Sequence, residues 1–268
     1  MCMRHAFVCY SLILFYCISN WAIDRLEYVE QRIQKQLKYH PNRLDLCPDY
    51  IEEELTPQNI TLILSQLSPQ QRLLVRELSI PSRQLNEIPL IVFNFRELRS
   101  LDLSWNELSY LPPEIGKLTS LEALKMETNR LMDVPVALKN LTHLHTLILS
   151  NNLFSEIPNE ILHLINLRML WMCDNQISRV TKKIGRLIHL SSLNLNGNRI
   201  QKLPQEISQL HDLTHLFLNH NQLQKLPFKI SVLAPHLQLL DLNNNTPPFS
   251  DAYKKELCSI LPTTSIVF

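Results

Sequence analysis

A 23-residue pattern recurs through most of this chain, and no other feature constrains its fold more strongly. Aligned on the first apolar residue, the copies begin at Val75, Leu98, Leu121, Leu144, Leu167, Leu190 and Leu213, with a partial copy at Leu237. Each copy places further apolar residues three and five positions after its start, as in LRSLDL from Leu98 to Leu103. This alternation predicts one short β-strand in each copy.

An asparagine follows the predicted strand in almost every copy. The series comprises Asn106, Asn129, Asn152, Asn175, Asn198, Asn221 and Asn245. A side-chain amide can satisfy backbone groups where the chain turns out of a strand, and an unpaired buried group costs about 1 to 3 kcal/mol. We therefore predict a structural asparagine ladder. Arg83 stands at this position in the first copy, and such a departure is typical of a terminal repeat.

The second half of each copy reads LPxxIxxL, with a proline ahead of two regularly spaced apolar residues. The prolines are Pro112, Pro135, Pro158, Pro204 and Pro227. Thr181 replaces the proline in one copy. Each segment is predicted to form a short turn or helix on the convex side. Because each copy can bury its apolar residues only against its neighbours, the stacked copies share one continuous core.

This pattern resembles the 23-residue class of intracellular leucine-rich repeat proteins, the group that includes the Ras-suppressor and Shoc-type scaffolds. The resemblance covers Val75 to about Pro247, roughly two thirds of the chain. It implies an α/β solenoid, or horseshoe, of about eight repeats over residues 75–247, with a parallel concave sheet. It also implies a non-catalytic scaffold or adaptor in signalling, although a fold alone does not fix a function.

Residues 1–23 form an apolar leader in which Arg4 precedes a long uncharged run. Its length suits a secretory signal peptide, a short membrane anchor or a segment that packs on the next helix. Cysteine usage argues against export, because Cys47, Cys173 and Cys258 make no disulfide framework beyond the leader. We therefore expect a cytoplasmic protein. Secretion, or membrane contact through an anchor at residues 6–23, is the alternative.

Residues 24–74 are predicted to form a helical cap on the open edge of the first repeat. Apolar residues recur at helical spacing over residues 26–37, and the turn-rich segment PNRLDLCPD follows over residues 41–49. Two further helices are predicted to begin after Thr56 and Ser68, because each hydroxyl cap precedes a first-turn proline.

The stretch 55–74 also resembles the first half of an F-box, which implies docking to a cullin-type ubiquitin ligase. The matching residues are Leu55, Ile63, Leu64, Leu67, Ser68, Pro69 and Leu73. The second half of the F-box pattern is missing, because the repeats begin directly afterwards. An F-box-like substrate receptor is thus an alternative to the scaffold, and an exported recognition or effector protein is another.

Residues 248–268 are predicted to form a C-terminal cap. Ser250 can begin a helix that presents Tyr253 and Leu257 on one face, and Pro262 ends it. The closing residues TTSIVF are predicted to form a final edge strand.

The strand residues between the core leucines are predicted to face the concave side and to form one surface. Met169, Trp171, Ile148 and Phe217 make an apolar band on it, and large exposed aromatic residues typically mark interfaces. We expect this surface to bind a protein or peptide partner. The predicted partner-binding residues are Asp102, Trp105, Lys125, Ile148, Met169, Trp171, Asn194, His215, Phe217, His220 and Asp241.

Composition and motifs argue against other classes of function. The 26 Lys and Arg residues balance 25 Asp and Glu residues, so no nucleic-acid partner is expected. With three glycines and no GxGxxG, Walker or HExxH motif, no cofactor, metal or small-molecule substrate is expected either. Cys173 and His215 would lie two strands apart, about 10 Å, too far for a nucleophile and its base. We predict no catalytic residues.

Overall fold

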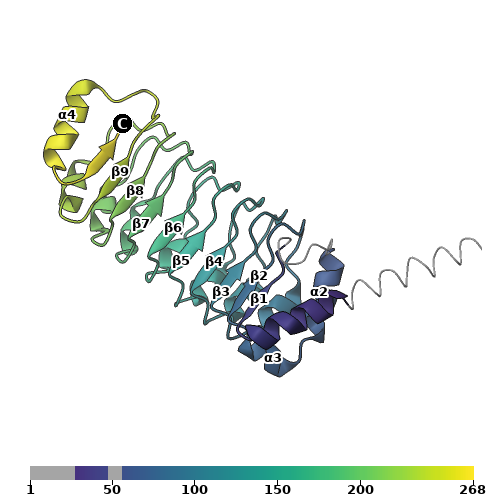
Figure 1. Cartoon of the computed structure of the whole chain (residues 1–268). Coiled ribbons are helices and arrows are strands. Elements are labelled where there is room, and N and C mark those ends of the chain that lie inside the picture. The colour runs from purple at the N-terminus through teal and green to yellow at the C-terminus, as the bar shows by residue number, and fades with distance from the viewer. Residues whose placement is uncertain (1–27, 48–55) are drawn as a thin grey trace, which may run out of the picture.

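A computed structural model describes residues 28–47 and 56–268. In this part of the chain, ten short strands form one parallel sheet in chain order, and Figure 1 shows them side by side along an elongated solenoid. The strands are β1 (Arg43–Asp45), β2 (Glu77–Ser79), β3 (Ser100–Asp102), β4 (Ala123–Lys125), β5 (Thr146–Ile148), β6 (Met169–Trp171), β7 (Ser192–Asn194), β8 (His215–Phe217), β9 (Leu239–Asp241) and β10 (Ser265–Val267). The predicted leader, residues 1–23, lies outside the described residues.

Every strand pairs with the next so that equivalent repeat positions stand opposite each other, as Leu78, Leu101 and Leu124 do. The middle residue of each strand from β2 to β9 points into the core and is at most 1% exposed. Because side chains alternate along a strand, the first and third residues face the opposite side. The predicted α/β leucine-rich repeat solenoid is confirmed.

Short 3-10 helices line the other side of the solenoid. They are η1 (Leu90–Asn94), η2 (Pro113–Lys117), η3 (Val136–Asn140), η4 (Ile161–His163), η5 (Lys182–Arg186), η6 (Gln205–Gln209) and η7 (Phe228–Leu233). Thr181 precedes η5 with the same extended backbone that Pro112 adopts before η2, so the missing proline does not change the local fold. The apolar residues of these segments that point inward, such as Ile115 and Leu187, are fully buried.

The asparagine side chains of the ladder are buried between repeats and bind the backbone. Asn129 is typical, because its Oδ1 accepts from the N–H of Leu108 at 3.0 Å and its Nδ2 donates to the carbonyl of Leu103 at 3.0 Å. Arg83 takes over part of this role in the first repeat. Its Nε donates at 2.7 Å to the carbonyl of Leu46. Leu46 directly follows β1, just as Leu103, the acceptor of Asn129, directly follows β3.

The strand β1 was not predicted, because residues 41–49 look like a turn. Its middle residue Leu44 and the residue directly after it, Leu46, are nonetheless fully buried and repeat the LxL pattern of the later strands. The spacing from Leu44 to Leu78 is 34 residues rather than 23, because two α-helices stand where later repeats have a 3-10 helix. These helices are α2 (Pro57–Gln66) and α3 (Pro69–Leu74).

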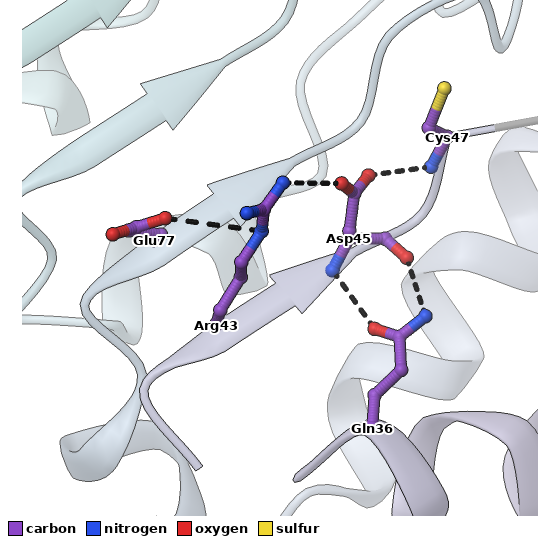
Figure 2. Close-up of polar contacts among 5 residues, drawn as sticks. All are labelled: Gln36, Arg43, Asp45, Cys47 and Glu77. Atoms are coloured by element: carbon purple, nitrogen blue, oxygen red, sulfur yellow. Dashed lines mark hydrogen bonds and ion pairs between the residues drawn. The ribbon is translucent and has the colours of Figure 1, made fainter. Parts of the chain in front are cut away.

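A glutamine side chain closes the free edge of β1, as Figure 2 shows. Gln36 lies in the helix over residues 28–39, its Nε2 donates to the carbonyl of Asp45 at 3.0 Å, and its Oε1 accepts from the Asp45 N–H at 3.1 Å. The amide thus satisfies both backbone groups as a neighbouring strand would. An open edge invites pairing with other chains, and this side chain blocks it.

The helices α2 and α3 begin as predicted. Thr56 accepts from the N–H of Asn59 at 3.2 Å, and Ser68 forms a reciprocal capping box with Gln71. Three residues that match the F-box pattern are at most 2% exposed in the shared core, namely Ile63, Leu64 and Leu67. Leu55 of that pattern lies outside the described residues. The apolar face of α2 is therefore occupied by the solenoid itself.

The C-terminal end carries α4 (Asp251–Ile260), which begins after Ser250 as predicted, because the Ser250 side chain accepts from the N–H of Tyr253. The hydroxyl of Tyr253 accepts from the N–H of Leu226 at 2.7 Å and so ties α4 to the last repeat. The predicted final strand is β10, which pairs with β9. Within residues 28–47 and 56–268, no helix combines the length and apolar character needed to cross a bilayer.

Candidate binding surface

The first and third residues of each strand form a surface that we call the sheet face. Most of these residues are half-buried in the internal strands, because neighbouring strands about 4.8 Å away cover their flanks. The core columns repeat the same residue types in every copy, whereas the residues of the sheet face differ from strand to strand. Variation on a constant scaffold is how a repeat protein acquires a specific surface.

Two apolar clusters stand out on the sheet face. Met169 and Trp171 come from β6, and the indole Nε1 of Trp171 donates a hydrogen bond to Oγ of Ser192 at 3.2 Å. His215 and Phe217 come from β8, and their rings stack with centroids 6.1 Å apart. Contacts within the chain thus orient both aromatic side chains.

The two clusters are separate, although the sequence predicts one band. The strand β7 lies between them, and its Asn194 stands in register between Trp171 and Phe217. Two strand spacings put the clusters about 10 Å apart. The surface therefore offers two apolar contacts with a polar strip between them.

Ile148, the fourth residue of the predicted band, is almost covered. It is 9% exposed and lies in register between Lys125 and Trp171. Its position on β5 is as predicted, but its side chain fills the surface beneath the longer neighbours. Ile148 is therefore a poor contact residue, and Trp171 carries the apolar character on this side.

Three polar residues of the predicted surface also shape the turns that follow their strands. The Oδ1 of Asp102 accepts from the N–H two residues later at 3.0 Å, and Asn194 and Asp241 make the same bond at 3.0 and 3.1 Å. The sequence contained a signal for these turns, because each of the three strands ends in an Asp or Asn that stands two positions before a polar residue. Asp and Asn side chains favour turns in which they accept from the N–H two residues later. These side chains are held in place by the backbone and remain part of the sheet face.

Trp105 and His220 lie beyond the strands, in the turns at the strand ends. Both adopt the left-handed backbone region, with φ of 59° and 51°, which is unusual for large side chains. Trp105 is 58% exposed, whereas the His220 ring contacts Asn219 and Asn244 at 3.2 and 3.1 Å. The structure therefore places Trp105 and His220 at the border of the sheet face.

Cys173 is the thiol nearest to this surface in sequence, two residues after Trp171. Burial raises its pKa, and the neighbouring Asp174 carboxylate acts in the same direction. A raised pKa lowers the thiolate fraction at neutral pH and makes the thiol a weaker nucleophile. Among the described residues, no three His, Cys, Asp or Glu side chains gather as metal ligands would.

The comparisons with known proteins agree with the fold. Leucine-rich repeat family models match residues 188–246, 97–118 and 143–164. No curated protein sequence is significantly similar to the chain. Among solved structures, an internalin from Listeria monocytogenes has a TM-score of 0.55 at 21% identity, over 74% of this chain and 62% of that one, and this likeness concerns the fold alone.

Two receptor structures share more of the sequence. The LRR ectodomain of the plant membrane receptor kinase GASSHO1/SCHENGEN3 from Arabidopsis thaliana, in complex with CASPARIAN STRIP INTEGRITY FACTOR 2, has 27% identity and a TM-score of 0.63 over 75% of this chain. A TDR receptor has 30% identity and a TM-score of 0.54 over 61% of this chain. The chain spans 25% and 29% of these two structures. The chain contains leucine-rich repeats, and its fold is a leucine-rich repeat solenoid.

Proposed function

We propose that the chain is a non-catalytic scaffold or adaptor that binds a protein or peptide partner on its sheet face. The observation that carries this proposal is the pair of apolar clusters around Trp171 and Phe217. Aromatic residues dominate the binding energy of many interfaces, and rings that are already oriented lose little freedom on binding. The stacked ring of His215 and the hydrogen-bonded indole of Trp171 meet this condition.

The arrangement favours a partner with two apolar side chains about 10 Å apart and a polar group between them. Ser192 and Asn194 line the strip between the clusters and can hydrogen-bond such a group. Asp102 and Lys125 would contact the partner on the side of β3 and β4, and Asp241 on the side of β9. Trp105 and His220 would contact it at the strand ends.

One solved relative supports the choice of ligand class. The plant receptor ectodomain described above was determined in complex with CASPARIAN STRIP INTEGRITY FACTOR 2, and it shares 27% identity with this chain. By analogy, we propose that recognition of another polypeptide is also the role of this solenoid, and that it serves a signalling process.

We further propose that the protein acts in the cytoplasm. Cys173 and Cys258 are free thiols, which suits a reducing compartment. The alternative is export or anchoring through residues 6–23, and the receptor ectodomain is a relative of that kind. Fractionation of the full chain with a C-terminal tag distinguishes the two. Recovery in the cytosol with the leader peptides detected by mass spectrometry supports our proposal, and recovery in membranes or medium contradicts it.

The experiment on binding compares three tagged full-length proteins recovered from cells with their bound proteins. They are the wild type, a double variant with Trp171→Ala and Phe217→Ala, and a control with Val136→Ala and Phe228→Ala. The control removes two side chains on the opposite face that are 61% and 88% exposed. We expect the control to retain a partner that the first variant loses by at least tenfold, because such residues contribute about 2 kcal/mol or more at interfaces.

Thermal melts of all three proteins exclude unfolding as the cause of a loss. If the variant lacking both aromatic rings keeps every partner of the wild type while it stays folded, the sheet face is not the binding surface. Loss of the partner only in the control would place binding on the 3-10 helix side instead.

A further inference from the structure

A second surface lies along the residues that directly precede the strands, which we call the strand-start rim. Its members stand next to each other because the backbone ladder links them, as in the bond from the Arg168 N–H to the His145 carbonyl at 2.8 Å. From β2 to β7 the rim reads Arg76, Arg99, Glu122, His145, Arg168 and Ser191. It is separate from the sheet face and makes no part of the proposed function.

The N-terminal part of this rim neutralises its own charges. Arg76 forms an ion pair with Glu97, which lies 21 residues later and directly before the copy that begins at Leu98. Arg99 pairs with Glu122, 23 residues later, at 3.1 Å. Arg76 and Arg99 thus each have a carboxylate partner 21 or 23 residues later in the chain, and neither guanidinium is left unpaired.

Arg168 occupies the same rim position, but no carboxylate stands 21 or 23 residues after it. The residues 21 and 23 positions later are His189 and Ser191. The Ser191 hydroxyl donates to the backbone carbonyl of Arg168 at 2.9 Å. Within residues 28–47 and 56–268, the guanidinium of Arg168 has no hydrogen bond, ion pair or ring contact.

An open hollow of about 400 Å³ surrounds this arginine. It is lined by His145, Asn166, Arg168, His189, Ser191 and Asp212. Asp212 is the one carboxylate among these six, and its Oδ2 already lies 3.1 Å from Nδ1 of His189. The hollow therefore presents the exposed guanidinium of Arg168, while its one carboxylate, Asp212, lies against the His189 ring.

Two exposed apolar residues directly precede lining residues of the hollow in the sequence. Ile165 directly precedes Asn166 and is 55% exposed, and Ile188 directly precedes His189 and is 45% exposed. Exposed apolar residues next to an unpaired charge are typical of the surfaces that bind amphipathic segments.

We propose that this hollow binds an acidic peptide segment of a partner protein, with an oxyanion opposite Arg168 and an apolar side chain on Ile165 and Ile188. The guanidinium presents parallel N–H donors that match a carboxylate or a phosphate in a bidentate manner. The partner thus supplies to Arg168 the negative charge that Glu97 supplies to Arg76 and that Glu122 supplies to Arg99. The binding energy comes from this pair and from the apolar contact.

The test uses fluorescence anisotropy of the full chain with labelled synthetic peptides at low ionic strength, where exposed charges are least screened. The first peptide carries glutamates around one leucine, the second carries phosphoserines in their place, and the third carries lysines. We expect binding of the first two and none of the third. The tighter of the first two identifies the source of the oxyanion.

Three single variants locate the site. Arg168→Glu reverses the charge, and Ser191→Glu places a carboxylate where Arg99 finds Glu122, so both should weaken binding of the acidic peptides at least tenfold. Arg199→Glu is the matched control, because Arg199 is exposed, follows β7 rather than preceding it, and undergoes the same change of charge. Its affinity should stay within twofold of the wild type.

All three residues lie at the surface, and thermal melts show whether each variant is folded. Equal weakening by Arg168→Glu and Arg199→Glu would mean that the peptides sense only the net charge, which overturns the proposal. Unchanged affinity in Ser191→Glu, or no binding of either acidic peptide to the wild type, also overturns it.

Discussion

The two halves of the solenoid share one scaffold and carry different surfaces. Up to β4, several arginines pair with carboxylates of the same chain, as Arg43 does with Asp45 and Arg99 does with Glu122. From β5 onward, the described residues contain no contact between an arginine or lysine and a carboxylate, and the His189 ring lies 3.1 Å from the Asp212 carboxylate. The sheet face changes in the same direction, from small or charged residues on β3 and β4 to Trp171 and Phe217 on β6 and β8.

This difference separates what holds the solenoid together from what it can bind. The N-terminal half pairs several of its surface arginines with its own carboxylates. The C-terminal half leaves Arg168 without a partner and presents two aromatic clusters, while its core columns are as well buried as those of the first half. Equivalent core or ladder substitutions in the two halves should therefore lower the free energy of unfolding by similar amounts. Binding of a partner should depend mainly on residues of the second half.

The largest effect should come from the asparagine ladder, and it should be equal in both halves. Asn129→Ala and Asn198→Ala each remove bonds to several buried backbone groups, including the N–H groups of Leu108 and Ile177. We expect each variant to lose about 2 to 4 kcal/mol in the free energy of unfolding, because buried groups stay unsatisfied. Urea melts measure this. A loss confined to one half would contradict the shared scaffold.

An effect of intermediate size should come from a substitution that gives Arg99 the same rim neighbour that Arg168 has. Glu122→Ser removes the carboxylate partner of Arg99 and gives the rim the residue that stands next to Arg168. We expect the variant to bind a second acidic peptide near Arg99, which a titration detects as added stoichiometry. An unchanged stoichiometry would show that internal pairing is not what distinguishes the two stretches of the rim.

The smallest effect should come from the closed N-terminal edge. Gln36→Ala removes the two hydrogen bonds to Asp45, but water can replace them, so we expect a loss of about 1 kcal/mol. Hydrogen exchange of the Asp45 amide should become faster, with no change at Lys125 in the middle of the sheet. If exchange at Asp45 stays slow, another group protects this edge.

The periodic positions could be predicted from the sequence because each of them has a neighbour of the same kind in the next repeat. Strand positions, the buried leucines and the ladder from Asn106 to Asn245 follow from this rule. The strand β1 could not be placed, because α2 and α3 lengthen its repeat and break the period. The pattern Leu44-Asp45-Leu46 was the remaining signal.

The details of the binding surface depend on contacts between repeats, which the period does not reveal. The sequence places Ile148 and Trp171 on one face, but only the structure shows that Ile148 is covered while Trp171 donates to Ser192. The lack of a carboxylate partner for Arg168 likewise depends on which residues stand 21 and 23 positions later in the chain. Comparison of those positions with Glu97 and Glu122 could have found it.

The most direct measurement of the central claim is photo-crosslinking from two positions in the full-length protein in cells. Benzoylphenylalanine replaces Ser192, between the two aromatic clusters, or Phe228, which is 88% exposed on the 3-10 helix side. We predict a discrete crosslinked polypeptide from position 192 and none of the same mass from position 228. The same product from both positions, or a product from position 228 alone, would contradict binding on the sheet face.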